Sequence, residues 1–309
     1  MDARDEHFRK TLKNLVSRQV LLDEPAERHT SIGVGGMVDA IVYPQNRDEL
    51  QQVVSYLGDC KVPFMPVGNW TNIIVKDGGY RGVVLSLQSL KHMTRTDRNA
   101  NHVLIRADAG TPLADIVRLA AEHSLTGVEF CTGIPGSVGG AVIMNAGAYG
   151  NDIKGVIETV YIMDTNGTLS EHNREALHFQ YRSLELPQET IITGATFLLT
   201  RGVKETIHHR IREILTMRKK KHPLEHRNAG SIFKNPQDQP AGQIIDALGL
   251  KGTRIGGAKI SEKHGNFIVN TGNAKAADIL ALIDMVSKRV WEERGIHLEP
   301  EVRIIGEDR

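Results

Sequence analysis

The chain has 309 residues, and its 38 Lys and Arg against 37 Asp and Glu give a formal net charge of +1. This balance produces no long-range field of one sign, so we do not expect binding to nucleic acid or to a charged membrane surface. A chain this long exceeds the size at which a single hydrophobic core stops growing, so two domains are expected.

The sequence shows no pattern typical of export or of a membrane span. Acidic residues stand in the stretch 2–6, where a secretory signal would be basic and then apolar, and no apolar run approaches the ~20 residues that span a bilayer. Cys60 and Cys131 follow no metal or redox spacing, and we assign them no role. We therefore expect a cytoplasmic protein that acts on a small molecule, with no metal site and no obligate protein partner.

Glycine is the unusual feature of the composition. The chain has 30 glycines, and 17 of them lie between Gly33 and Gly155. Extended and helical patterns alternate in this half, beginning with a capping box at Asn46 and Glu49 that predicts a helix. A later helix is expected to have Thr111 as its N-cap. The strands expected here are 40–43, 62–67 and 103–107.

The pattern changes along the second half of the chain. The stretch 157–199 predicts antiparallel strands, with a turn at Asn166-Gly167. The composition then shifts near residue 200, where we place a domain boundary. Beyond it we expect helices at 204–221, 241–248 and 274–294, and strands at 266–270 and 296–305.

Two glycine-rich loops could hold a phosphate-containing cofactor. The loop 68–72 follows a strand and the loop 133–140 precedes a helix, where backbone N–H groups can approach a phosphate unobstructed. Neither loop has the spacing of a Rossmann or P-loop motif, and the alternative that the glycines only make tight turns stays open. Two such loops in one half indicate one extended cofactor.

Polar residues of the second half could bind a substrate. Ser231 lies among small residues in the stretch 228–236, and the basic run 218–221 is either a solvated helix end or a site for phosphate or carboxylate groups. Arg182 and Glu301 are either a structural ion pair or catalytic groups. The stretch 222–226 matches the H-x-x-E-H pattern of zinc proteases, but Pro223 and the lack of a third ligand argue against zinc.

Taken together, five segments resemble one family, the UDP-N-acetylenolpyruvoylglucosamine reductases (MurB family). The segments are 29–36, 133–150, 181–183, 228–236 and 298–301. The resemblance implies an α+β protein, with an FAD-binding fold of the vanillyl-alcohol-oxidase/PCMH type, made of two subdomains, and a C-terminal α+β substrate-binding domain. The implied division is an N-terminal helical segment 1–20, the FAD-binding domain 21–200 and the substrate-binding domain 201–309.

The resemblance also implies an activity. Hydride would pass from NADPH by way of FAD to the enolpyruvyl group of UDP-N-acetylglucosamine enolpyruvate, giving UDP-N-acetylmuramate for bacterial peptidoglycan. Arg182, Ser231 and Glu301 would be catalytic, and Lys221 and Asn235 would bind the substrate. The residues expected at FAD are Val67, Gly68, Asn69, Trp70, Thr71, Asn72, Ile134, Pro135, Gly136, Ser137, Gly140 and Ala141.

The sequence departs from the family pattern at the first loop. The family has Gly-x-Gly-Ser-Asn, whereas this chain has Trp70 for the second glycine and Thr71 for the serine. The stretch between Arg182 and the helix at 204 is short, as in the type II subclass. Two other functions remain open at this point, namely an FAD-dependent oxidase of a hydroxy acid or sugar on the same fold, and a flavin-free binding protein.

Overall fold

The computed structural model describes residues 2–187 and 189–308, which form two compact units. The first unit comprises residues 2–22, 39–69 and 82–217, and the second comprises 23–38, 70–81 and 218–308. These units cut across the sequence ranges 21–200 and 201–309, because 23–38 and 70–81 pack with C-terminal residues. The three sequence domains stay a prediction.

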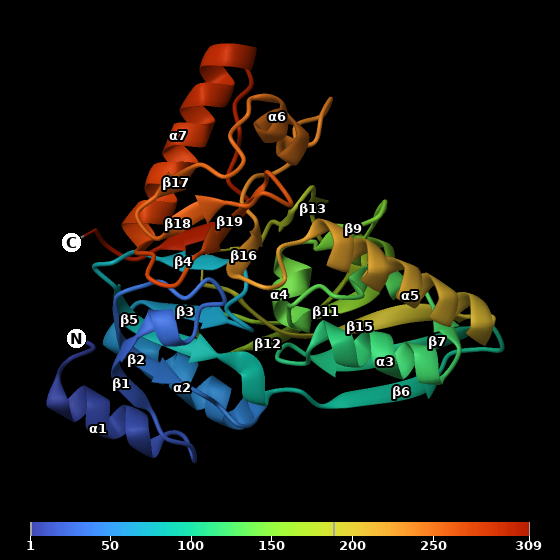
Figure 1. Ribbon diagram of the computed structural model, residues 1–309. Coiled ribbons are helices and arrows are strands. Elements are labelled where there is room, and N and C mark those ends of the chain that lie inside the picture. The colour runs from blue at the N-terminus through green and yellow to red at the C-terminus, as the bar shows by residue number, and fades with distance from the viewer. Residues whose placement is uncertain (1, 188, 309) are drawn as a thin grey trace. The chain divides into compact units, whose positions relative to one another are not determined.

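One sheet of four strands has the order β1-β2-β5-β3 (Figure 1). Its helix α2 begins after Asn46, whose side chain accepts a hydrogen bond from the Glu49 N–H at 2.8 Å, as the capping box predicted. The apolar face of α2 packs on the sheet to form one core. The bounds are α1 Glu6–Asn14, β1 Leu21–Pro25, β2 Met37–Val42, α2 Arg47–Cys60, β3 Phe64–Val67 and β5 Tyr80–Ser86.

A larger antiparallel sheet of the first unit has the order β12-β11-β15-β7-β6, with β8 paired to β15. Helices α3 and α4 bury their apolar residues in its core. The antiparallel portion predicted over 157–199 is confirmed, since β11 pairs with both β12 and β15. The bounds are β6 Met93–Asp97, β7 His102–Asp108, α3 Leu113–Glu122, β8 Leu125–Thr126, α4 Val138–Ile143, β11 Ile157–Met163, β12 Leu169–Asn173 and β15 Ile191–Arg201.

The second unit is built on a sheet in the order β16-β19-β18-β17, and on the parallel pair β4 and β20. Helices α6 and α7 supply much of its core. Gly295 ends α7 in the left-handed conformation at φ +66°, as its position predicted. The bounds are β4 Ile73–Val75, β16 Arg227–Ser231, α6 Ala241–Ala247, β17 Arg254–Ile255, β18 Ala258–Ile260, β19 Phe267–Asn270, α7 Ala276–Arg294 and β20 Arg303–Ile305.

One long helix and several short elements complete the chain. Helix α5, Lys204–Lys221, runs from the first unit into the second. Two hairpins of two-residue strands come from the first unit: β9 Gly147–Ala148 with β10 Asn151–Asp152, and β13 Phe179–Gln180 with β14 Ser183–Leu184. The 3-10 helices are Ala26–Arg28, Leu87–Ser89, Glu129–Cys131, Ile153–Gly155 and Arg174–Ala176.

Two predicted details are wrong. Pro112, not Thr111, is the N-cap of α3, because its φ of −60° and ψ of 137° keep it outside the helix. The final strand begins at Arg303 rather than 296, because residues 299–302 instead bond to the segment around Ile232. Residues 299–302 are therefore held by residues 232–234, which follow Ser231.

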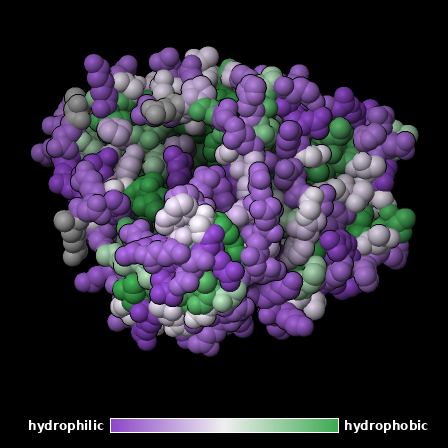
Figure 2. Space-filling view, turned by 90° about the horizontal axis from the view of Figure 1, so that it is seen from above, coloured by the Kyte–Doolittle hydropathy of each residue, from purple (hydrophilic) through white to green (hydrophobic). Residues whose placement is uncertain are grey.

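The face shown in Figure 2 is mainly hydrophilic. On this face, hydrophobic residues form small groups among hydrophilic ones. Among the described residues, no helix is long and apolar enough to cross a membrane.

Candidate active site

The two predicted glycine-rich loops meet at Gly68 and Ser137 in the first unit. A methyl group on Gly68 would lie 2.0 Å from the Ser137 Oγ, so any larger residue at position 68 would have to displace the Ser137 side chain. Ser137 is itself the N-cap of α4, with its Oγ 3.5 Å from the Gly140 N–H. The structure therefore brings the end of β3 against the start of α4.

Backbone hydrogen bonds hold the second loop in place. The Leu113 N–H donates to the Gly136 carbonyl at 2.9 Å, and the Val138 N–H donates to the Thr111 carbonyl at 2.9 Å. The loop that follows β7 thus packs against the loop that precedes α4. This arrangement places residues 134–141 beside 67–69, as a shared cofactor site requires.

Buried hydroxyl groups give a test of whether this region suits a polar cofactor. The side-chain oxygens of Ser86, Thr111 and Thr132 are buried and make no hydrogen bond to any described residue. Ser86 is paired with Val67 across β5 and β3, and Thr111 and Thr132 flank the second loop. Buried polar groups normally have partners, so the region fits a ligand rich in hydrogen-bonding groups, such as FAD.

The second half of the first loop belongs to the second unit. Trp70 has φ +53°, the left-handed conformation that glycine adopts readily and that costs other residues about 1–2 kcal/mol. The indole is 2% exposed and packs against the His29 ring. The loop thus has the backbone that the family glycine would favour, with a buried tryptophan in its place.

Ser231 and Glu301 come from two sequence motifs that the second unit brings together. The Glu301 N–H donates to the Ile232 carbonyl at 2.7 Å, and Phe233 forms a bridge with Pro300. The Asn72 side-chain amide donates to the Glu301 carbonyl at 3.1 Å. The segments that contain Ser231 and Glu301 and the end of the loop 68–72 therefore lie in one small region of this unit.

Arg182 lies in the first unit at the turn of the hairpin β13–β14. Its φ of +60° is left-handed, and its Nη1 donates to the Gly147 carbonyl at 2.8 Å. Its guanidinium also lies 5.3 Å from the centre of the Tyr181 ring. A turn residue with a strained backbone and a fixed, half-buried guanidinium is typical of a functional arginine.

Lys221 and Asn235 both belong to the second unit. Lys221 is the exposed last residue of α5. The Asn235 Oδ1 accepts a hydrogen bond from the Ala241 N–H at 3.0 Å, which orients the side-chain amide. Their roles as substrate-binding residues stay proposals.

The residues of the H-x-x-E-H pattern, 222–226, make contacts other than with a metal. Glu225 forms an ion pair with Lys263 at 2.9 Å, and the His222 ring packs against His264 and Phe267. Burial lowers the pKa of His222 to about 4, helped by the charges of Arg218, His264 and Lys221. Groups of three or more residues able to hold a metal ion are absent from the described part of the chain.

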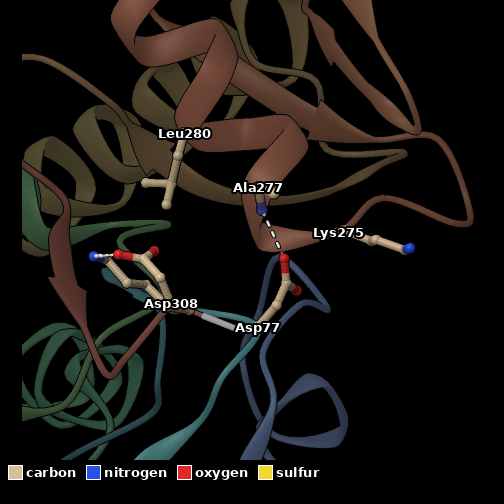
Figure 3. Close-up of a pocket in the computed structure, with 6 residues that line it drawn as sticks. Asp77, Lys275, Ala277, Leu280 and Asp308 are labelled. Atoms are coloured by element: carbon tan, nitrogen blue, oxygen red, sulfur yellow. Dashed lines mark hydrogen bonds and ion pairs between the residues drawn. The ribbon is translucent and has the colours of Figure 1, made fainter.

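A separate cavity of about 350 Å³ lies at the start of α7 in the second unit (Figure 3). Its walls include Asp77, whose carboxylate accepts hydrogen bonds from the Ala276 and Ala277 N–H groups at 3.0 and 2.9 Å. Lys76 and Asp308 form an ion pair at 2.8 Å in the same wall. Asp77 thus caps the helix, and Lys76 and Asp308 pair with each other. The cavity contains none of the predicted site residues.

Comparison with known proteins identifies the family. Residues 38–172 match the family model described as FAD binding domain, and residues 222–305 match the C-terminal domain of UDP-N-acetylenolpyruvoylglucosamine reductase. A reductase of that name from Syntrophus aciditrophicus is 52% identical over 98% of this chain and 97% of its own length. The chain belongs to the UDP-N-acetylenolpyruvoylglucosamine reductase family.

Other members agree with this assignment. The reductase from Geobacillus kaustophilus is 40% identical over the full length of both chains. The crystal structure of the reductase from Thermus caldophilus is 35% identical, superposes with a TM-score of 0.78, and covers 93% of this chain and 98% of that one. The predicted α+β, FAD-binding fold with a C-terminal substrate domain is confirmed.

Family membership also decides between the three functions that the sequence left open, in favour of the reductase.

Some residues of the site were not predicted from the sequence. Ser86 and Thr132 stand in no motif, and Thr111 was interpreted as a helix cap.

Proposed function

We propose that this chain reduces the enolpyruvyl group of UDP-N-acetylglucosamine enolpyruvate to give UDP-N-acetylmuramate, with FAD bound and NADPH as hydride donor. It would do so in the cytoplasm, on a free nucleotide sugar, as part of bacterial peptidoglycan synthesis. The observation that carries the proposal is the pairing of the Ser231 and Glu301 segments in a member of the reductase family. The reaction adds one hydride and one proton to a carbon–carbon double bond.

FAD would be held in the first unit by residues 67–69 and 134–141, and at the end of the first loop by Trp70, Thr71 and Asn72. The Gly68–Ser137 approach and the buried hydroxyls support this assignment. When bound, FAD supplies hydride transfer from NADPH to the substrate double bond.

The side chains supply charge and a proton. Hydride addition at the terminal carbon leaves negative charge on the neighbouring carbon and its carboxylate, and the Arg182 guanidinium, fixed by Gly147, would stabilise that charge. Glu301 would donate a hydrogen bond to the carboxylate when it is protonated. The Ser231 hydroxyl would donate the proton to carbon and then recover one from solvent.

Lys221 and Asn235 would bind the UDP portion of the substrate. The ammonium of Lys221 would contact the diphosphate, and the Asn235 NH₂ would donate a hydrogen bond. The net charge of +1 is compatible with this, because the anionic substrate needs local cations and not a basic surface.

Anaerobic half-reactions test the proposal. The purified protein should show the visible absorption of bound flavin, lose it on addition of NADPH, and regain it when the enolpyruvyl substrate is added without oxygen. Rapid recovery with oxygen and none with the substrate would instead indicate an oxidase. A protein that takes up no FAD would contradict both enzyme functions.

A further inference from the structure

Trp70 combines a backbone conformation that favours glycine with a large, buried side chain. Its φ of +53° lies in the region that favours glycine, yet its large side chain is 2% exposed. Among the described residues its indole N–H makes no hydrogen bond. A bulky residue keeps such a conformation only where surrounding contacts hold it there.

Those contacts come from the segment that contains the 29–36 motif. The His29 ring lies 5.7 Å from the indole, centre to centre, and the His29 Nε2 is 3.0 Å from a Glu24 carboxylate oxygen. The Ser31 N–H donates to the Trp70 carbonyl at 3.1 Å. Both the side chain and the backbone of Trp70 are therefore held by residues 29–31.

The rest of the loop is fixed to the segments that contain the proposed catalytic residues. The Ser31 hydroxyl donates to the Asn228 carbonyl at 2.7 Å and lies 3.3 Å from the Thr71 carbonyl. The Arg303 N–H donates to the Asn72 carbonyl at 3.0 Å. Each of the residues 70–72 is therefore hydrogen-bonded through its carbonyl to another segment of the second unit.

We propose that Trp70 is a positioning residue, which locks the loop 68–72 in its FAD-binding conformation before the cofactor binds. This inference rests on the proposed assignment of the loop to FAD. A glycine at position 70 would adopt the same backbone without strain, but it would leave the loop free to sample other conformations. The buried indole removes that freedom, so FAD binding has less ordering to impose.

The test is a comparison of FAD affinity between two variants of the flavin-free protein, measured by quenching of flavin fluorescence. Trp70→Gly should bind FAD about tenfold more weakly or worse, although it restores the family residue. Trp70→Phe keeps an aromatic ring in the same space and should bind within about threefold of the unmodified chain. Equal affinity of Trp70→Gly and the unmodified chain would overturn the proposal. So would a tenfold loss in Trp70→Phe, since that loss would mean that the indole N–H contacts the cofactor directly.

A second measurement does not depend on the folding of a Trp70 variant. The chain has two tryptophans, and Trp291 is 48% exposed on α7, so Trp291→Phe leaves Trp70 as the source of tryptophan emission. In the flavin-free Trp291→Phe protein, acrylamide should quench this emission poorly, and added FAD should not shift its wavelength. Emission of an exposed indole that becomes buried on FAD addition would show that the loop is not preformed.

The role of His29 gives a third measurement. His29→Ala should weaken FAD binding in the unmodified chain, but it should have little further effect in the Trp70→Gly background, because the two rings act through one contact. Fully additive losses would overturn this coupling. If the unmodified chain binds no FAD, the proposed function is wrong. If it binds FAD but the variants do not show the expected changes in affinity, only the inference about Trp70 is wrong.

Discussion

The Ser231 hydroxyl gives the most direct test of the mechanism at the scale of single residues. A serine is a weak acid, so it can deliver a proton to carbon only when it touches the carbanion that forms. We expect Ser231→Ala to leave reduction of the bound flavin by NADPH nearly unchanged, while its reoxidation by the enolpyruvyl substrate slows by about 10²–10⁴-fold. Stopped-flow absorbance of each half-reaction measures both rates. Equal slowing of the two would argue that Ser231 affects the cofactor site and not proton transfer.

The close approach of Gly68 and Ser137, where the two glycine-rich loops meet, can be tested by substitution. Gly68→Ala would place a methyl group 2.0 Å from the Ser137 Oγ, so we expect a loss of about 1–3 kcal/mol in the free energy of unfolding. In the double variant Gly68→Ala/Ser137→Ala the nearest remaining atom is the residue 137 Cβ at 3.1 Å, so much of that loss should be recovered. Urea unfolding of the four proteins of this cycle measures the effect. No recovery in the double variant would mean that the clash lies elsewhere.

The glycine pattern shows how far single residues could be predicted. Gly68 and the loop that includes Ser137 are predicted to form one site, because one glycine-rich loop follows a strand and the other precedes a helix, and the structure brings them together. The conformation at Trp70 could not be predicted, because a tryptophan has no preference for φ +53°. Contacts with residues about 40 positions earlier in the sequence hold it there, namely the His29 ring against the indole and the Ser31 N–H on the Trp70 carbonyl.

Helix α7 shows the same limit at the scale of elements. Its C-terminal end at Gly295 was predicted from local sequence, as was the start of α2 at Asn46. At the start of α7 a local and a distant contact combine: Asp278 accepts from the Lys275 N–H at 3.0 Å, and Asp77, which is 199 residues away from Ala276 in the sequence, accepts from the Ala276 N–H at 3.0 Å. The predicted start at 274 lies two residues before the observed one at Ala276. Local patterns therefore place the ends of this helix closely, but they do not show the contact with the distant segment.

The Asp77 contact predicts a measurable contribution to the stability of this helix. Asp77→Ala removes two hydrogen bonds to the first turn of α7 and a negative charge near its N-terminus (Figure 3). We expect the free energy of unfolding to fall by about 1–2 kcal/mol. Asp308→Ala is the matched control from the same cavity, and because its ion pair with Lys76 is exposed it should cost less than about 1 kcal/mol. Equal costs for the two variants in urea unfolding would exclude the capping role.

At the scale of the whole molecule, the sequence predicted the α+β class and the order of the elements. It did not predict the composition of the two compact units. Segments 23–38 and 70–81 belong to the unit that holds the C-terminal residues, because β4 pairs with β20 and Ser31 bonds to Asn228. Such long-range pairings leave no periodic pattern in the sequence, since each partner is a short stretch of two to five residues.

Two half-buried histidines, His222 and His264, make the stability of the folded chain depend on pH. His222 and His264 pack against each other and Phe267, and burial lowers the pKa of both, that of His222 to about 4 from 6.5. The charges of Arg218 and Lys221 lower the His222 pKa further, and those of Lys251 and Lys221 act on His264. Between pH 6.5 and about 4, the unfolded chain therefore binds protons that the folded chain does not.

It follows that the free energy of unfolding should be insensitive to these groups above pH 6.5 and should fall as the pH is lowered toward 4. His222→Gln removes one of the titrating groups, so its urea midpoint should fall less steeply with decreasing pH than that of the unmodified chain. His226→Gln, at an exposed position four residues later, is the control and should keep the original slope. If His222→Gln and the unmodified chain lose stability in parallel over this range, the His222 ring is not kept neutral by its surroundings, and acid sensitivity must come from other groups.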